Sequence, residues 1–253
     1  MGKIAHLNKK VVLTIAGFDS RSGGGMVTDA LMFSKVGVFP LCVHTATVVV
    51  DDKTFKISPC SAQLVAAQFE ALAEVNFAAI KIGFIPNNEI LDLVVDFVAQ
   101  RPNIPLIVDP VLSFKEGEEG WVEDVDFVPK LIKLMKNANY ITPNRTEWEY
   151  LQKFTDVLRG STIVVKDIDP TSQNAHDLVL IYGQKKPLSL VKPRVKTSTN
   201  NGAGCALSAA ICALAALYPR FEPHEVVSKA KNLVWNAISV GFQFKKGGSV
   251  HPV

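Results

Sequence analysis

A glycine-rich turn before an alanine-rich helix carries the main chemical signal of this sequence. Residues 198–201 are polar, Gly202-Ala203-Gly204 follows them, and the chain is then almost wholly apolar up to Pro219. This pattern predicts a buried helix with an anion site at its start, because glycines let an oxyanion approach the free N–H groups of the first turn. Cys205 falls in that turn, where the helix dipole is expected to lower the pKa of a thiol and make it a base or a nucleophile.

A structural interpretation of the same stretch has equal weight. Gly-Ala-Gly would also allow tight packing of the helix on a sheet, with Cys205 as a small buried hydrophobe. A second glycine-rich turn favours the chemical interpretation, since Ser22-Gly23-Gly24-Gly25 lies between the apolar run of residues 11–17 and a helical pattern. This turn matches neither GxGxxG nor GxxxxGK[ST], and no dehydrogenase fingerprint is present.

Polar side chains also follow other predicted strands. Asp109 ends a short apolar run, Asn144 and Glu147 come after another, and Lys166 ends a third. Because the carboxyl ends of parallel strands share one edge of a sheet, we expect these groups at one rim. Asn144 and Glu147 would suit a hydrated Mg²⁺ that carries phosphates, or they could form an N-cap with a capping-box glutamate, and both roles can hold together. This set of groups is the one that phosphoryl transfer needs, with Cys205 as the base.

The first strand places further candidates at the same rim. Gly17 and Asp19 follow it directly, and Asp29 lies in the helix after the glycine turn. We expect all three near a pocket, although Asp29 could instead belong to a solvated helical face. A charged, glycine-bearing segment, residues 114–121, has the composition of a mobile lid or of a plain surface loop.

The alternation of elements predicts the fold. Apolar runs of strand length alternate with amphipathic helical patterns, and a hairpin is expected around residues 184–186. This order is typical of a doubly wound, mostly parallel sheet flanked by helices. A chain of 253 residues with 48% hydrophobic content can bury one large core, so we expect residues 1–253 to form a single domain.

Composition excludes several classes of protein. The 27 basic and 24 acidic residues give a net charge of +3, without a basic cluster beside aromatic residues, so nucleic acid is not an expected partner. The four cysteines show neither zinc spacing nor a disulfide framework, which favours a reducing cytoplasm. The N-terminal segment lacks the features of a signal peptide, and no uninterrupted apolar run suggests a membrane span.

Six motifs in order resemble the ribokinase-like superfamily. They are TIAGxDxxxGGG followed by Asp29, KIG, VDPV, ITPNxxE, VVK and NGAGC, and together they extend over nearly the whole chain. Within the superfamily, the sequence is similar to the hydroxymethylpyrimidine/phosphomethylpyrimidine kinases and to the related bacterial pyridoxine/pyridoxal kinases. The resemblance implies an ATP- and Mg²⁺-dependent, homodimeric kinase that phosphorylates the hydroxymethyl group of a small heteroaromatic alcohol.

The resemblance also implies a role for each matching residue. Residues 202–204 would form the anion hole and Cys205 would be the general base. Asn144 and Lys166 would bind ATP, with Glu147 and Asp109 near the metal. The remaining matches would line the ring pocket, and they are Gly17, Asp29, Val50, Phe84 and Val111.

Two departures from the family pattern bear on function. Pyrimidine kinases of this branch usually carry Gln where Val50 stands, and valine cannot pair with ring nitrogens, so we expect a vitamin B6 substrate, with hydroxymethylpyrimidine as the alternative. Asp167 follows Lys166 where the family has glycine, which puts a negative charge beside the polyphosphate. A further alternative is therefore a degenerate homologue that binds a vitamin without turnover.

Overall fold

The computed structural model describes residues 9–50, 55–112, 126–244 and 247–252, except for the side chain of Val50. The segment 114–121, for which a lid was considered, lies outside these ranges. Within them, no helix is both long and apolar enough to cross a membrane.

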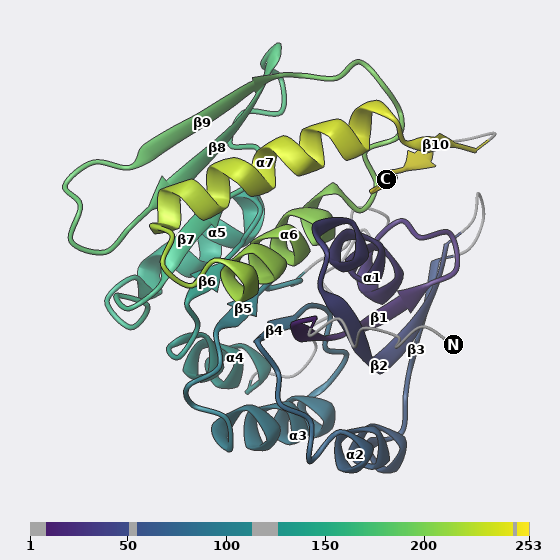
Figure 1. Cartoon of the computed structure of the whole chain (residues 1–253). Helices are drawn as coiled ribbons and strands as arrows, with labels where there is room; N and C mark the ends of the chain where they lie inside the picture. Colours follow the sequence, from purple (N-terminus) through teal and green to yellow (C-terminus); the bar gives the residue numbers. More distant parts are fainter. Residues whose placement is uncertain (1–8, 51–54, 113–125, 245–246, 253) are drawn as a thin grey trace, which may run out of the picture.

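A nine-stranded sheet forms the centre of the molecule (Figure 1). Its strands, in order across the sheet, are β3 (Phe55–Pro59), β2 (Phe39–Val50), β1 (Val11–Asp19), β4 (Ala79–Ile82), β5 (Leu106–Val108), β6 (Tyr140–Ile141), β7 (Thr162–Val165), β8 (Asn174–Leu180) and β9 (Leu188–Pro193). The strands from β2 to β7 pair in parallel, whereas β3, β8 and β9 pair antiparallel. The predicted mostly parallel sheet and its hairpin are confirmed.

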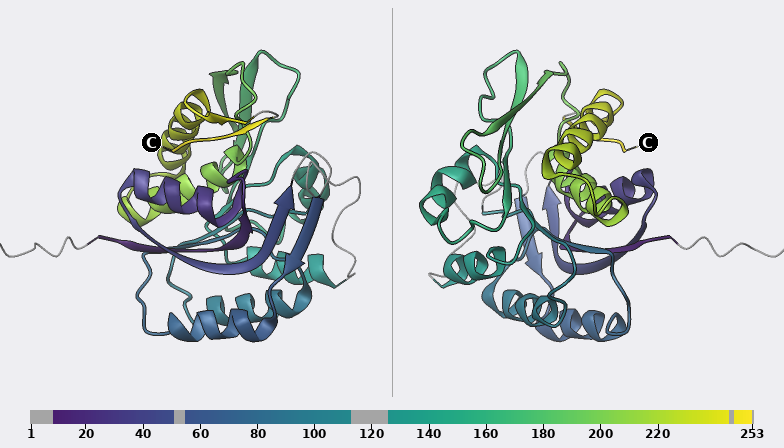
Figure 2. Two further views of the ribbon diagram at one scale, coloured as in Figure 1. Left: turned by 90° about the vertical axis from the view of Figure 1, so that its right-hand side faces the viewer. Right: turned by 60° about the vertical axis from the view of Figure 1, so that its left-hand side comes forward.

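Helices cover both faces of this sheet (Figure 2). One face carries α1 (Gly25–Val36), α6 (Ala203–Leu217) and α7 (Pro223–Ser239), and the other carries α2 (Ala62–Ala71), α3 (Asn88–Ala99) and α4 (Phe127–Met135). A separate cluster of buried apolar side chains fills each interface between helices and sheet. This is the doubly wound α/β arrangement that the alternation of elements predicts.

Strand β3 and the ends of two helices have only weak signals in the sequence. The segment Phe55–Pro59 was not expected as a strand, because it is short and contains an exposed lysine and a terminal proline, features that only an edge strand tolerates. Helix α7 ends at Ser239, and Val240 follows it with a non-helical backbone. Helix α5 (Arg145–Leu151) is short and continues as a 3-10 turn, Gln152–Phe154. These ends fall where weak local signals leave a helix boundary undetermined.

Helix α6 is buried along nearly its whole length. Residues from Ala206 to Ala216 are all inaccessible to solvent or nearly so, and the helix packs against α1, α7 and the strands β1, β4 and β5. A helix with neighbours on every side needs apolar residues all round rather than on one stripe, which explains its composition. Its N-terminal turn is the part that reaches the edge of the sheet (Figure 1).

A short C-terminal ladder holds the turn before α6. Strands β10 (Phe242–Gln243) and β11 (Gly248–Ser249) pair antiparallel. The N–H of Asn201 donates to the carbonyl of Gly248 at 3.3 Å, and the N–H of Val250 donates to the carbonyl of Asn201 at 3.0 Å. The Ser249 hydroxyl donates to the Arg21 carbonyl at 3.1 Å, so one ladder fixes both glycine turns.

Gly25 is the tightest point of the first glycine turn. Its φ is +66°, and a Cβ there would lie 2.2 Å from the carbonyl oxygen of Gly17. Only glycine combines a left-handed backbone with so close an approach of another chain segment. The turn at the start of α1 therefore has this shape because the sequence supplies glycine at this position.

We expect Gly25→Ala to lower the free energy of unfolding by about 2 kcal/mol or more, because the methyl group meets backbone that cannot move aside. Gly160→Ala is the matched control, since a Cβ at Gly160 has no atom within 4 Å. It should change stability by less than about 0.5 kcal/mol. Urea unfolding of both variants measures the difference, and equal stabilities would contradict this account of the turn.

Candidate active site

A cavity of about 720 Å³ opens at the carboxyl ends of the parallel strands. Its wall includes Asp19 from the end of β1, Gly83 after β4, Asp109 after β5 and Lys166 after β7. The residues from Asn200 to Cys205 complete the wall at the start of α6. The structure thus brings both glycine turns and most of the predicted polar residues to one hollow, the position where ligands bind in open parallel sheets.

The first turn of α6 faces this cavity with a glycine on each side of Ala203. Gly202 has a φ of +82°, the left-handed conformation that lets the chain enter the helix sharply. A Cβ on Gly204 would lie 3.2 Å from Lys166 Nζ, so glycine allows the ammonium group to approach the helix start. First-turn N–H groups lack intrahelical acceptors, and the helix dipole favours negative charge there. The arrangement can bind an anion between these amides and Lys166.

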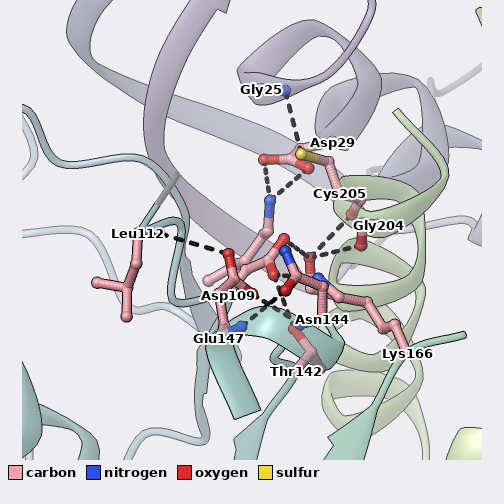
Figure 3. A network of polar contacts seen from close by, with 12 residues as sticks. Gly25, Asp29, Asp109, Leu112, Thr142, Asn144, Glu147, Lys166, Gly204 and Cys205 are labelled. Carbon is pink, nitrogen blue, oxygen red and sulfur yellow. Dashed lines mark hydrogen bonds and ion pairs between the residues drawn. The ribbon is translucent and has the colours of Figure 1, made fainter. Parts of the chain in front are cut away.

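Lys166 forms an ion pair with Asp109 across the site. Their charged atoms lie 2.6 Å apart, and Asp109 also accepts hydrogen bonds of 3.2 Å from the hydroxyl groups of Thr142 and Ser208 (Figure 3). Burial opposes ionisation of Asp109, but the ammonium groups of Lys166 and Lys81 outweigh it and lower the pKa of the carboxyl. Asp109 is therefore a carboxylate that holds Lys166 at the cavity wall.

Asn144 and Glu147 form the capping box of helix α5. The Asn144 side chain accepts from the Glu147 N–H at 2.8 Å, and Glu147 accepts from the Asn144 N–H at 2.7 Å. The second Glu147 oxygen accepts from the Leu112 N–H at 3.4 Å (Figure 3). Burial, with a smaller contribution from Asp109, raises the pKa of Glu147 to about 7, although Lys166 acts in the opposite direction. The predicted capping box is therefore present, and its hydrogen bonds leave the Glu147 side chain few free lone pairs.

The acidic residues alone do not make a metal cage. Among the residues that the structure describes, no group of three or more His, Cys, Asp or Glu side chains could hold an ion. Asp109 is close enough to Glu147 for its charge to raise the pKa of that carboxyl. Two carboxylates are enough for Mg²⁺ only when phosphate oxygens and water molecules supply most of its ligands.

Cys205 lines the cavity beside the first glycine turn. Its Sγ accepts a hydrogen bond from the Gly25 N–H at 3.3 Å (Figure 3). Contrary to the expected effect of the helix dipole, burial raises the pKa of this thiol to about 11. Lys81 and the Gly25 N–H favour the thiolate, but they are outweighed, and Asp109 and Asp29 disfavour it further. The prediction of a lowered pKa was wrong because it considered only the dipole.

Asp29 does not lie on the cavity wall, which corrects its predicted place in the ring pocket. Its side chain is fully buried, and it binds Lys81 Nζ at 2.6 and 2.7 Å and the Thr14 hydroxyl at 2.6 Å. It is therefore not on a solvated helical face either. Lys81 is itself fully buried and contributes to the wall, so the pair lies between the core and the cavity.

The other end of the cavity is apolar. Gly17, Val48, Phe84 and Val111 line it beside Asp19, and Ala46, Val48 and Phe84 form a small separate cluster against which Val111 packs. A Cβ on Gly17 would lie 3.2 Å from the Phe84 ring, so glycine gives the ring its place. Val50 ends β2, and its side chain is outside the described part of the structure. This end can hold a flat, largely apolar ring.

Six charged residues of the cavity wall were not recognised from the sequence, among them Arg145 and Lys192. The other four form hydrogen-bonded ion pairs, and they are Lys81, Asp177, Arg194 and Lys231. Lys81 belongs to a motif that was noticed, but a single lysine in an apolar strand gave no sign of its buried partner. The other three pair with residues 27 to 54 positions away in the chain, and no local spacing signals such contacts. Only the sheet order could have indicated them.

Fold and site together define a small-molecule kinase: an α/β sheet with a lysine, an acidic pair and an anion-binding helix start around one cavity beside an apolar pocket. The family model described as phosphomethylpyrimidine kinase matches residues 19–253, and the chain belongs to this family within the ribokinase-like superfamily.

Known relatives agree with this membership. The hydroxymethylpyrimidine/phosphomethylpyrimidine kinase of Haemophilus influenzae is 32% identical, with 92% of each chain covered. A putative pyridoxine kinase of Staphylococcus epidermidis is 26% identical, with 92% of this chain and 90% of the relative covered. The solved pyridoxal kinase of Staphylococcus aureus in complex with AMP-PCP has a TM-score of 0.83 and 26% identity, and the match covers 96% of this chain and 93% of that one.

We expect Lys81→Met to lower the free energy of unfolding by about 3 to 5 kcal/mol, because it leaves the Asp29 carboxylate buried without a cationic partner. Lys130→Met is the control, since the Lys130–Asp92 pair is exposed and should contribute less than about 1 kcal/mol. Chemical denaturation measures both, and Asp29→Asn combined with Lys81→Met should recover part of the loss. Equal effects of the two single changes would show that the buried pair carries no special weight.

Proposed function

We propose that the protein uses ATP to phosphorylate the hydroxymethyl group of pyridoxal, pyridoxine or pyridoxamine. The observation that carries the proposal is the convergence, in one cavity, of the Lys166–Asp109 pair and the first-turn amides of α6, next to an apolar pocket. Phosphoryl transfer depends mainly on positioning and on neutralisation of charge, and these groups supply both.

In this proposal the nucleotide and its metal occupy the half of the cavity formed by β5 to β9 and α7. Lys166 and Asn144 would bind the phosphates of ATP, and Asp109 and Glu147 would lie beside an Mg²⁺ held chiefly by phosphate and water. The ion would neutralise charge on the polyphosphate. The related pyridoxal kinase bound to AMP-PCP supports a nucleotide site in this fold.

The residues 202–204 would form the anion hole for the transferred phosphoryl group. Cys205 adjoins them and is the proposed general base for the acceptor hydroxyl. Because burial raises the pKa of its thiol to about 11, only a small fraction is thiolate at neutral pH. As long as the pH is below this pKa, each increase of one pH unit raises the thiolate fraction about tenfold. A catalytic role for the thiolate therefore requires a rate that increases with pH.

The ring would bind in the apolar pocket between Gly17, Phe84 and Val111, with Asp19 at its edge. Valine at position 50 removes the amide expected of a pyrimidine kinase, which supports a B6 vitamer. A pyrimidine substrate is the second candidate, because the 32% identical relative carries that name. A vitamin-binding protein without turnover is the third, because of Asp167. We also propose that the protein is a homodimer in the cytoplasm. All four cysteines are free thiols, which supports a reducing compartment.

Coupled ADP-release assays with pyridoxal, pyridoxine and hydroxymethylpyrimidine at equal concentrations test the substrate. We expect kcat/KM for a B6 vitamer to exceed that for the pyrimidine by about tenfold or more, since a pocket without the pairing amide loses its discrimination in favour of the pyrimidine. The reverse order would assign the protein to thiamine synthesis. Tight pyridoxal binding without any ATP binding would show that it is not an enzyme.

Replacement of the proposed base tests Cys205. We expect Cys205→Ala to lower kcat by roughly 10² to 10⁴ and to leave the KM values for both substrates little changed. In the wild type, kcat should increase between pH 7 and 9, and the variant should lose this dependence. Turnover like that of the wild type, or an unchanged pH profile, would remove Cys205 from this role.

A further inference from the structure

Asp167 places a carboxylate in the proposed nucleotide half of the cavity. It directly follows Lys166, lines the same cavity, and its side chain is 40% exposed. Its φ is +46°, a left-handed conformation that few residues other than glycine adopt. Left without a partner, this charge would repel the phosphates of a nucleotide bound at Lys166.

Arg194 holds Asp167 from the end of β9. Its guanidinium donates to both carboxylate oxygens of Asp167, at 2.7 and 3.0 Å. This two-pronged contact is the strongest geometry that an arginine makes with a carboxylate. The same guanidinium donates to the carbonyls of Asp169, Ser172 and Asn174 at 3.0, 2.9 and 3.2 Å. Arg194 therefore holds the loop after β7 in place and also pairs with the negative charge of Asp167.

A second ion pair, between Asp177 and Lys231, contacts the backbone of Asp167. The N–H of Asp167 donates to Asp177 Oδ1 at 2.9 Å, and Asp177 Oδ2 lies 2.5 Å from Lys231 Nζ. Asp177 and Lys231 are both buried, and they come from β8 and α7. Each acidic group of this cluster thus has a basic partner, and the left-handed backbone of Asp167 is held from two sides.

We propose that Arg194 determines nucleotide affinity by neutralising Asp167, which lets a polyphosphate bind next to a carboxylate. The inference rests on the proposed function, because it assumes that this half of the cavity receives ATP. Arg194 acts through Asp167 and is a positioning residue. The departure from glycine at position 167 is thereby compensated elsewhere in the same chain, which favours an active kinase over a degenerate homologue.

Isothermal titration calorimetry with AMP-PCP, AMP and adenosine in the presence of Mg²⁺ tests the inference. The variants are Arg194→Gln, Asp167→Asn and the double variant, since Asn has the shape of Asp and tolerates a left-handed backbone. Arg159→Gln is the control, because Arg159 pairs with Asp156 on the surface. Thermal unfolding of each variant reports whether the fold is retained.

We expect Arg194→Gln to weaken AMP-PCP binding about tenfold, which corresponds to about 1.4 kcal/mol. AMP should lose less and adenosine nothing, because the effect depends on ligand charge. The double variant should bind AMP-PCP within about threefold of the wild type, since it carries no unpaired charge. In assays, Arg194→Gln should raise the KM for ATP with kcat nearly unchanged.

Three results would overturn the inference and leave the proposed function intact. The first is unchanged AMP-PCP affinity in Arg194→Gln. The second is a double variant as weak as Arg194→Gln, which would mean a direct contact or a collapsed loop. The third is an equal loss of affinity for adenosine. A wild-type protein that binds no nucleotide would instead overturn the proposed function, and the inference with it.

Discussion

Burial of helix α6 is the constraint on which the site depends. The helix is enclosed by the sheet, α1 and α7, so its direction is fixed by apolar contacts along nearly its whole length. It reaches the cavity near its N-terminal end, through Ala203, Gly204, Cys205 and Leu207, and the N–H groups of a first helical turn have no acceptor within the helix. The amides that would receive a phosphoryl group are therefore preorganised by the core, and no reorganisation is needed when charge develops there.

Buried charges complement that helix start. The pairs Lys81–Asp29 and Lys166–Asp109 bring cations close to the amides and keep each acid neutralised. Pairing of this kind explains how the site can hold buried ionised groups that would be costly to bury alone. The pKa of Cys205 follows from the same neighbours: burial raises it most, Lys81 favours the thiolate, and Asp109 and Asp29 disfavour it.

The order of elements, the parallel sheet and both glycine turns were predictable from the sequence, because hydrophobic periodicity and glycine positions are local signals. Local signals also indicated Asp109, Asn144, Glu147 and Lys166, since each follows an apolar run. Contacts across the sheet were not predictable. Asp29 looked like a pocket residue because nothing near it in the sequence reveals Lys81, and Arg194 has its partner 27 residues earlier. The prediction of a lowered pKa for Cys205 was wrong for a similar reason, since the sequence near Cys205 shows neither its burial nor its charged neighbours.

The ladder of β10 and β11 has a consequence for the order in which the molecule folds. Ser249 bonds to Arg21 across 228 residues of sequence, and Gly248 and Val250 hold Asn201 just before the anion turn. Contacts between segments so far apart close late and slow the search for the native state. During synthesis, the sheet and its helices can assemble first, whereas the turn gains its support only after the segment with Ser249 has left the ribosome. Binding competence is therefore among the last properties that the nascent chain acquires.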